Sequence, residues 1–187
     1  GVIPPHKSFA PMVQDICNSN GILLITDEVI TAYGRTGAWS GARLWGIQPD
    51  MMCTAKAITN GYFPFGALML GHRVVDVFED NPAAKIGHGY TYSGHPVACA
   101  AGLAALDVLE RDGLIERVAS MAPKFEAALH GLQNSRYVAD IRNFGFAGGI
   151  TIEAAPGEPM LRPFKIAMAM WNKGFYVRYG GDTIQIG

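Results

Sequence analysis

Residues 22–28 read Ile-Leu-Leu-Ile-Thr-Asp-Glu, an unbroken apolar run that ends in the carboxylates Asp27 and Glu28. An apolar run without alternation is typical of a strand that is covered on both faces, as in the parallel sheets of α/β proteins. Ligands of open α/β sheets bind in the crevice outside the carboxyl ends of such strands. The stretch therefore predicts the centre of an α/β sheet, with a candidate site where the strand ends.

The segments around this strand continue the α/β pattern. Apolar residues at helical spacing predict a helix over residues 8–19, and short apolar runs predict buried strands over residues 50–54 and 66–71. Further helices are expected at residues 73–78, 96–111, 114–132 and 162–173, and further strands at residues 138–141, 149–152, 175–178 and 183–186. Residues 33–49 are so rich in glycine and turn formers that no regular element is expected there.

The pattern of expected secondary structure changes near Asn134. Short strand-like pieces then alternate with one helix, which is typical of a small α+β lobe. We therefore expect residues 1–133 to belong to a large α/β domain and residues 134–187 to begin a second, smaller domain. The chain starts at Gly1 without a methionine and stops at Gly187 inside a strand-like run, so we expect it to be part of a longer protein.

The composition argues against several classes of function. The 15 basic and 16 acidic residues give a formal net charge of −1, so there is no basic surface to bind nucleic acid. No apolar run approaches the roughly 18 residues that span a bilayer, so no membrane partner is expected. Charged residues make up 17% of the chain, against a usual value of about 25%, which suggests that oligomerisation covers part of the surface.

The spacing of cysteine and histidine predicts no metal site. The three cysteines, Cys17, Cys53 and Cys99, form no C-x-x-C pair, so neither zinc nor a disulfide framework is indicated. The five histidines show no H-x-x-x-H or H-E-x-x-H spacing. We therefore expect no metal ligand in this chain and a reducing compartment, the cytoplasm.

Lys56 helps to choose between interpretations of the Asp27-Glu28 pair. It lies just past the second expected strand among small and apolar neighbours, where desolvation would favour the neutral amine that a Schiff-base lysine requires. A cofactor with an aldehyde and a pyridine ring would use both groups, Lys56 as the imine and Asp27 to keep the ring nitrogen protonated. A lysine that merely extends from the sheet into water is the structural alternative.

Two other interpretations of the acidic pair stay open at this point. Carboxylates after a strand also cap helices or stabilise loops. An apolar strand followed by Asp-Glu is also the outline of the metal-binding strand of a P-loop ATPase, in which Asp27 would hold magnesium and Glu28 would polarise water. No G-x-x-x-x-G-K-[ST] motif occurs in these residues to support the ATPase.

Four motifs resemble one enzyme family. They are GILLITDEVITAYGRTG at residues 21–37, DMMCTAKAITNGY at residues 50–62, HGYTYSGHP at residues 88–96 and GFYVRYGGDT at residues 174–183. Together they resemble the class III pyridoxal-phosphate aminotransferases of fold type I, and most of all the omega-amino acid (beta-alanine):pyruvate aminotransferases. The resemblance implies a large α/β domain with a mainly parallel sheet, present here in part, followed by the start of a small α+β domain.

The resemblance also implies a role for each matching residue. Lys56 would form the Schiff base with pyridoxal 5′-phosphate and shuttle a proton, and Asp27 would bind the pyridinium nitrogen. Val29 would pack on the ring face, although plain core packing explains that residue equally well. Thr91, with Tyr90 beside it, would bind the cofactor phosphate across a dimer interface.

Arg178 matches the family's substrate arginine. It would hold the carboxylate of pyruvate or of the amino acid with a bidentate fork, whereas a surface arginine on a strand is the structural alternative. Family members also carry an N-terminal part with a Gly-Ser phosphate turn, an aromatic residue on the cofactor and an acidic residue near its phenolic oxygen. These pieces have no counterpart in the chain, and the resemblance implies that they precede Gly1.

The resemblance implies a ping-pong transamination that moves an amino group from an ω-amino acid or amine, such as β-alanine, to pyruvate. It also implies a homodimer or homotetramer whose subunits share the active site. Alternatives within the family are another class III aminotransferase and a semialdehyde aminomutase. Outside it, the P-loop ATPase and a non-catalytic module that serves association stay open.

Overall fold

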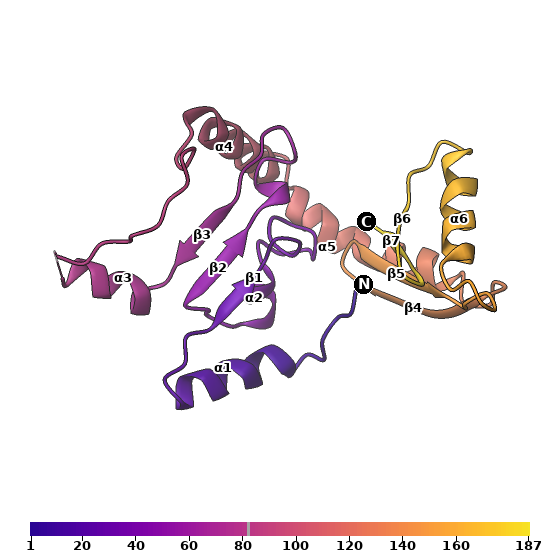
Figure 1. Cartoon of the computed structure of the whole chain (residues 1–187), viewed down its shortest axis with the longest axis horizontal. Coiled ribbons are helices and arrows are strands. Elements are labelled where there is room, and N and C mark those ends of the chain that lie inside the picture. Colours follow the sequence, from indigo (N-terminus) through magenta and orange to yellow (C-terminus); the bar gives the residue numbers. More distant parts are fainter. Residues whose placement is uncertain (82) are drawn as a thin grey trace. The chain divides into compact units, whose positions relative to one another are not determined.

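The computed structural model describes residues 1–81 and 83–187. These residues form two compact units. The first unit is His6–Glu116, and the second unit combines Gly1–Pro5 with Arg117–Gly187. Each unit has a sheet and helices of its own (Figure 1). Within the described residues, every helix is too short or too polar to span a bilayer.

The division between the units does not coincide with the expected domain boundary. It falls between Glu116 and Arg117, inside the helix α5, Leu114–His130, and it assigns the first five residues to the second unit. The assignment of residues 1–133 and 134–187 to two domains stays a prediction.

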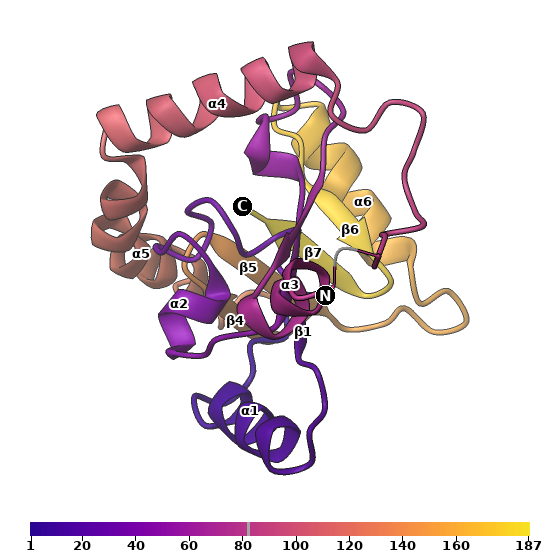
Figure 2. The same cartoon turned by 90° about the vertical axis from the view of Figure 1, so that its left-hand side faces the viewer.

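The first unit is built on a three-stranded sheet of β1 (Ile25–Asp27), β2 (Met51–Thr54) and β3 (Ala67–Leu70). The strand order is β1-β2-β3, in which β1 and β2 are parallel and β3 is antiparallel to β2. The helical elements of this unit are α1 (Phe9–Ser19), α2 (Gly41–Trp45), η1 (Lys56–Ile58), α3 (His72–Glu79) and α4 (Pro96–Arg111). The helices α1 and α4 lie toward opposite ends of the sheet (Figures 1 and 2).

The short helix α2 corrects the expectation that residues 33–49 form no regular element. Ser40 starts the helix, because its side chain accepts a hydrogen bond from the backbone N–H of Arg43 at 3.1 Å. Gly46 ends it in the left-handed conformation at φ 67°. The turn formers that argued against an element are therefore the residues that delimit one.

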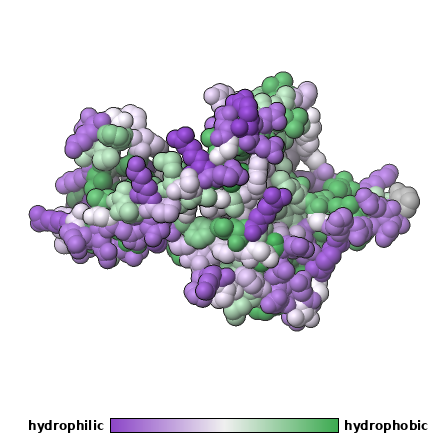
Figure 3. Space-filling model, turned by 180° about the vertical axis from the view of Figure 1, so that it is seen from behind, coloured by the Kyte–Doolittle hydropathy of each residue, from purple (hydrophilic) through white to green (hydrophobic). Residues whose placement is uncertain are grey.

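The expectation that residues 22–26 form a strand covered on both faces is wrong for this chain. The strand begins only at Ile25, and the side chains of Ile22, Leu23 and Ile25 are exposed. The reason is that, among the described elements, only β2, its neighbour within the sheet, packs extensively against β1, so that helices do not cover both of its faces. Apolar surface also shows between polar side chains in the space-filling view of Figure 3.

Asp50 links the two chain segments in which the parallel strands β1 and β2 begin. Its backbone N–H donates to the carbonyl of Leu24 at 2.8 Å, and its buried carboxylate accepts from the N–H of Leu24 at 2.7 Å. Arg73 neutralises this carboxylate from 3.0 Å. A buried carboxylate needs such partners, because desolvation of an unpaired charge is costly.

The second unit has a four-stranded antiparallel sheet in the order β4-β5-β7-β6. Its strands are β4 (Val138–Phe144), β5 (Ala147–Ile152), β6 (Arg178–Gly180) and β7 (Thr183–Ile186), and α6 (Leu161–Trp171) follows β5. The core contains Leu129 of α5 together with Ile150, Ile152 and Ile184 of the sheet. Gly148 permits the close approach of α5, because a Cβ there would lie 2.7 Å from Leu129 Cδ2.

Arg142 joins the first residues of the chain to this sheet. Its Nε donates to the carbonyl of Val2 at 2.6 Å, and its Nη2 donates to the carbonyl of Gly1 at 2.8 Å. Its Nη1 donates to Asp140 and to the Thr151 hydroxyl, each at 2.7 Å. All three guanidinium nitrogens are therefore used within one partly buried network.

Replacing Arg142 by methionine is expected to lower the free energy of unfolding of the second unit by about 1–3 kcal/mol, because several partly buried acceptors lose their donor. Urea denaturation followed by circular dichroism measures the change. Arg117→Met is the control, since Arg117 is exposed, and a change within about 0.5 kcal/mol is expected for it. Equal stabilities of the two variants would contradict the structural role of Arg142.

Candidate active site

The carboxyl ends of β1 and β2 bring the predicted catalytic segments to one edge of the sheet. Asp27, the last residue of β1, pairs with Cys53 in the parallel ladder. The N–H of Glu28 donates to the carbonyl of Cys53 at 2.8 Å, so the pairing continues past the end of β1. Lys56 follows two residues after Thr54, where β2 ends. The ligands of α/β sheets bind at this end of the sheet, where the parallel strands have their carboxyl ends.

Lys56 lies at a sharp turn of the backbone. Ala55 is extended, and Lys56 has a φ of +50°, in the left-handed region that side chains other than glycine rarely adopt. Two buried residues follow and hold the turn: Ile58 lies in the core, and the Thr59 hydroxyl donates to the carbonyl of Phe63 at 2.6 Å. The backbone direction at Lys56 is therefore set by its neighbours.

The side chain of Lys56 is exposed and has no hydrogen-bond or ion-pair partner among the described residues. The expected desolvation by small and apolar neighbours is therefore not supplied by this part of the chain. The amine is free to react with a group that reaches the edge of the sheet.

Asp27 has one engaged oxygen and one free oxygen. Its Oδ1 accepts from the N–H of Val29 at 3.0 Å, which fixes the carboxylate against the turn that follows. Its Oδ2 makes no hydrogen bond within the described residues, and the residue is exposed. Val29 itself is half-buried. A carboxylate in this arrangement can accept a hydrogen bond from a cationic ring N–H.

Glu28 has a different role from its neighbour. It is buried, and its two oxygens accept from the N–H groups of Gly41 at 2.8 Å and Ala42 at 2.7 Å, in the first turn of α2. The Thr31 hydroxyl donates to the same carboxylate. The capping interpretation of the acidic pair thus holds for Glu28. Since its oxygens are engaged, Glu28 is not placed to polarise water as in an ATPase.

Tyr90 and Thr91 lie in a turn that is closed by two hydrogen bonds. The N–H of Tyr90 donates to the Ser93 hydroxyl at 3.0 Å, and the N–H of Ser93 donates to the carbonyl of Tyr90 at 3.0 Å. The His88 ring lies edge-on to Tyr90, with the ring centroids 5.0 Å apart. Both Tyr90 and Thr91 are exposed, and among the described residues no hydrogen bond links this turn to Asp27 or Lys56.

Arg178 belongs to the second unit. It is the first residue of the edge strand β6, where it pairs with Gln185 of β7. Its side chain is exposed and makes no hydrogen bond or ion pair within the described residues. A guanidinium without an internal partner keeps its full capacity for a bidentate contact with a carboxylate.

A hydrogen bond that the sequence did not reveal lies beneath the candidate site. The hydroxyl of Tyr33 donates to the hydroxyl of Thr54 at 3.1 Å, and both residues are buried. Their separation of 21 residues carries no periodic signal. Tyr33 could have been noticed only for its place between Ala32 and Gly34 in a turn-rich segment, which suggests no function.

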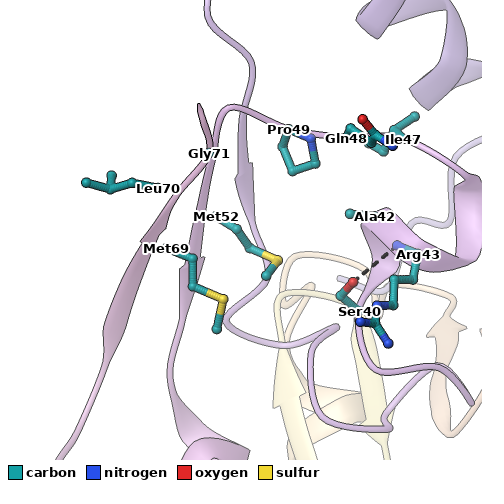
Figure 4. Close-up of a pocket in the computed structure, with 10 residues that line it drawn as sticks. All are labelled: Ser40, Ala42, Arg43, Ile47, Gln48, Pro49, Met52, Met69, Leu70 and Gly71. Carbon is teal, nitrogen blue, oxygen red and sulfur yellow. Dashed lines mark hydrogen bonds between the residues drawn. The ribbon is translucent and has the colours of Figure 1, made fainter. Parts of the chain in front are cut away.

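A pocket of about 280 Å³ lies elsewhere in the first unit (Figure 4). Its lining residues come from α2, the loop after it, β2 and β3: Ser40, Ala42, Arg43, Ile47, Gln48, Pro49, Met52, Met69, Leu70 and Gly71. None of the predicted site residues lines it. Among the described residues, no group of three or more histidine, cysteine or acidic side chains could hold a metal ion.

Comparison with known proteins gives consistent matches over the whole chain. A family model described as aminotransferase class-III matches residues 1–186. A beta-alanine–pyruvate aminotransferase of Pseudomonas aeruginosa is 51% identical over 191 residues, which cover 100% of this chain and 43% of that protein. An omega-amino acid–pyruvate aminotransferase of Pseudomonas putida is 50% identical, with coverages of 100% and 42%.

Solved structures agree in fold. An amine transaminase from an uncultivated Pseudomonas species, in its PLP-bound (internal aldimine) form, is 37% identical with a TM-score of 0.92. The match covers 100% of this chain and 44% of that chain. The chain thus spans less than half the length of the relatives that it matches.

Gly41→Ala is expected to lower the free energy of unfolding of the first unit by about 1–3 kcal/mol. The added Cβ would lie 2.8 Å from Trp45 Cζ3 and 3.1 Å from a Glu28 oxygen, so the Trp45 ring must shift and the Glu28 carboxylate must give way slightly. Denaturant titration measures the change.

Gly87→Ala is the matched control, because a Cβ at Gly87 meets nothing within 4 Å. We expect its stability to stay within about 0.5 kcal/mol of the unsubstituted chain. If Gly41→Ala were equally harmless, the contact between Glu28 and α2 would not contribute to stability.

Proposed function

This chain belongs to the class III aminotransferases, and on that premise we propose that it forms part of an enzyme that transfers an amino group from an ω-amino acid or amine, such as β-alanine, to pyruvate. The observation that carries the proposal is the parallel register of β1 and β2, which directs Asp27 and Lys56 to the same edge of the sheet. The substrate class follows the names of the two Pseudomonas relatives.

Class III aminotransferases use pyridoxal 5′-phosphate, and a related amine transaminase has been solved with it bound. The donor set at the sheet edge fits this cofactor, since an exposed amine can bind its aldehyde and a carboxylate with a free oxygen can bind its ring N–H. When bound, the cofactor supplies an electron sink. The Lys56 amine and the Asp27 carboxylate therefore suit a group with an electrophilic end and a basic ring nitrogen.

Each site residue of this chain would then have its own role in binding the cofactor or in moving a proton. Asp27 would hold the proton on the ring nitrogen. Lys56 would hold the cofactor through its aldehyde and, once the amine of the substrate has displaced it there, would move a proton at the substrate carbon. Val29 packs on the ring face. The Thr91 hydroxyl binds the phosphate, with Tyr90 beside it. Within the part of the chain that the structure describes, the Lys56 amine, one Asp27 carboxylate oxygen and the hydroxyl of the exposed Thr91 have no hydrogen-bond partner, which supports these roles.

Arg178 would hold the carboxylate of each substrate in turn. A ping-pong reaction requires one site to accept an amino donor and then a keto acid, and a guanidinium fork recognises the carboxylate that β-alanine and pyruvate share. The exposed, unpaired side chain of Arg178 supports this role.

The same proposal includes a homodimer or homotetramer in which Thr91 serves the partner's site. The support is the exposure of large side chains on either side of Thr91, with Tyr90 77% and Tyr92 80% exposed. Such side chains are typical of interface centres. A cytoplasmic location is also proposed, on the composition and cysteine spacing described above.

Among the alternatives, another class III amino donor or an aminomutase reaction keeps the same catalytic residues and differs only in the product formed. The ATPase is not retained, because the whole chain matches an aminotransferase and both oxygens of Glu28 bind backbone amides.

Incubation of the protein that contains this chain with pyridoxal phosphate, followed by borohydride reduction, is expected to leave a pyridoxyl group on Lys56. Peptide mapping by mass spectrometry locates the label. Lys56→Ala should abolish it, because Lys56 is the amine that the β1–β2 register brings to the end of the sheet that carries Asp27. Lys124→Ala, at an exposed helical position, should be labelled at Lys56 as before.

Labelling spread over surface lysines, or no labelling together with ATP binding, would overturn the proposed function.

Arg178→Gln is expected to raise the KM for pyruvate at least tenfold, because a charge-assisted bidentate contact is worth about 1.5–3 kcal/mol. Borohydride labelling of Lys56 should be unchanged. Steady-state kinetics measure the effect, with Arg117→Gln as a control of the same charge change. An unchanged KM for pyruvate in Arg178→Gln would remove this residue from the substrate site.

A further inference from the structure

We propose that the Tyr33 hydroxyl is a positioning group for Lys56, through its hydrogen bond to Thr54. The inference rests on the proposed function, in which Lys56 and Asp27 bind opposite ends of one cofactor. It concerns two buried residues to which the proposed function gives no role.

The hydrogen bond joins the two segments that carry the reactive groups. Tyr33 lies within the turns of residues 29–36 that follow Asp27 and Glu28, and Thr54 precedes Lys56 by two residues. The backbone ladder between these segments ends with the bond from Glu28 to Cys53. Beyond that point, the Tyr33–Thr54 bond of 3.1 Å ties the two segments together. Thr54 Oγ1 in turn donates to the carbonyl of Ala67 in β3 at 3.4 Å, which anchors the pair to the sheet.

Tyr33 contacts the chain on both sides of Lys56. Its hydroxyl binds Thr54 before the lysine, and its ring packs in one buried cluster with Ile58 after it. Both Tyr33, at φ +62°, and Lys56, at φ +50°, have left-handed backbones. Residues other than glycine keep such a conformation only where their surroundings hold it. Tyr33 is held by its own N–H, which donates to the carbonyl of Trp39 at 2.8 Å.

The hydroxyl is not required for packing alone. A phenylalanine ring would fill the same space, and a buried hydroxyl costs free energy unless it finds a partner. Here the partner is a second buried hydroxyl at the end of the strand that leads to the lysine. A satisfied buried polar pair of this kind fixes one arrangement of the segments that it joins. We infer that it fixes the direction of the Lys56 amine relative to Asp27.

The test uses the protein that contains this chain, freed of cofactor and then mixed with pyridoxal phosphate. The variants are Tyr33→Phe, Thr54→Val, their double variant, and Thr54→Ser, which keeps the hydroxyl. The first readout is the rate at which the borohydride-trapped label appears on Lys56. The second is the division of any kinetic loss between kcat and KM.

Each single variant is expected to slow labelling of Lys56 about three- to tenfold, the effect of one lost buried hydrogen bond. The double variant should be no slower than either single variant, because both remove the same bond. Thr54→Ser should restore most of the rate that Thr54→Val loses. The kcat should fall by a similar factor with both KM values unchanged, since neither hydroxyl touches a substrate. Tyr137→Phe, which removes a hydroxyl in the second unit, is the control.

Additive losses in the double variant, a Thr54→Ser protein as slow as Thr54→Val, or a Tyr33→Phe protein with the original labelling rate would each overturn the positioning role while leaving the proposed function in place. Absence of label on Lys56 in the unsubstituted protein would overturn both. Melting temperatures of all variants show whether a slow variant is folded, and Thr54→Ser against Thr54→Val tests the acceptor without altering Tyr33.

Discussion

The parallel pairing of β1 with β2 is the constraint on which the first unit depends. The two strands share only three ladder positions, so bonds at both ends must hold them: Asp50 with Leu24 at the start, and Glu28 with Cys53 at the finish. A slip of one residue would turn every side chain of β1 to the other face. Such a slip would move Asp27 away from the face that the turn at Lys56 serves. The bonds outside the ladder are therefore part of what specifies the site.

Two adjacent carboxylates serve separate purposes because successive side chains of an extended chain point to opposite faces. Asp27 is exposed at the sheet edge, whereas Glu28 is buried against α2. The buried carboxylate binds two backbone N–H groups that a five-residue helix leaves without internal partners. The acidic pair thus combines a reactive group with the support of a neighbouring loop.

The elements that local periodicity determines were predictable from the sequence. The helices at α1, α4 and α5 and the strands at β2 and β7 were expected within a few residues of their observed bounds, and the fold class agrees with the solved relatives. The edge of the sheet that carries Asp27 and Lys56 was also expected. Helix α2 was not, because the residues that delimit it, Ser40 and Gly46, are turn formers that equally predict a loop. The Tyr33–Thr54 bond and the bonds of Arg142 to Gly1 and Val2 were not, because their partners lie 21 to 141 residues apart. Sequence periodicity carries no record of such pairings.

The hydrogen bonds from Arg142 to Gly1 and Val2 have a consequence for the order in which parts of the chain fold during synthesis. These two residues are synthesised 140 residues before their partner, a delay on the order of ten seconds at usual translation rates. The first unit has no such long wait for its strands, since β1 to β3 lie close together in the chain. A nascent chain could therefore pair β1, β2 and β3 while Gly1 and Val2 still lack their partner, and contacts between residues far apart in the sequence form slowly because the intervening chain must first be ordered.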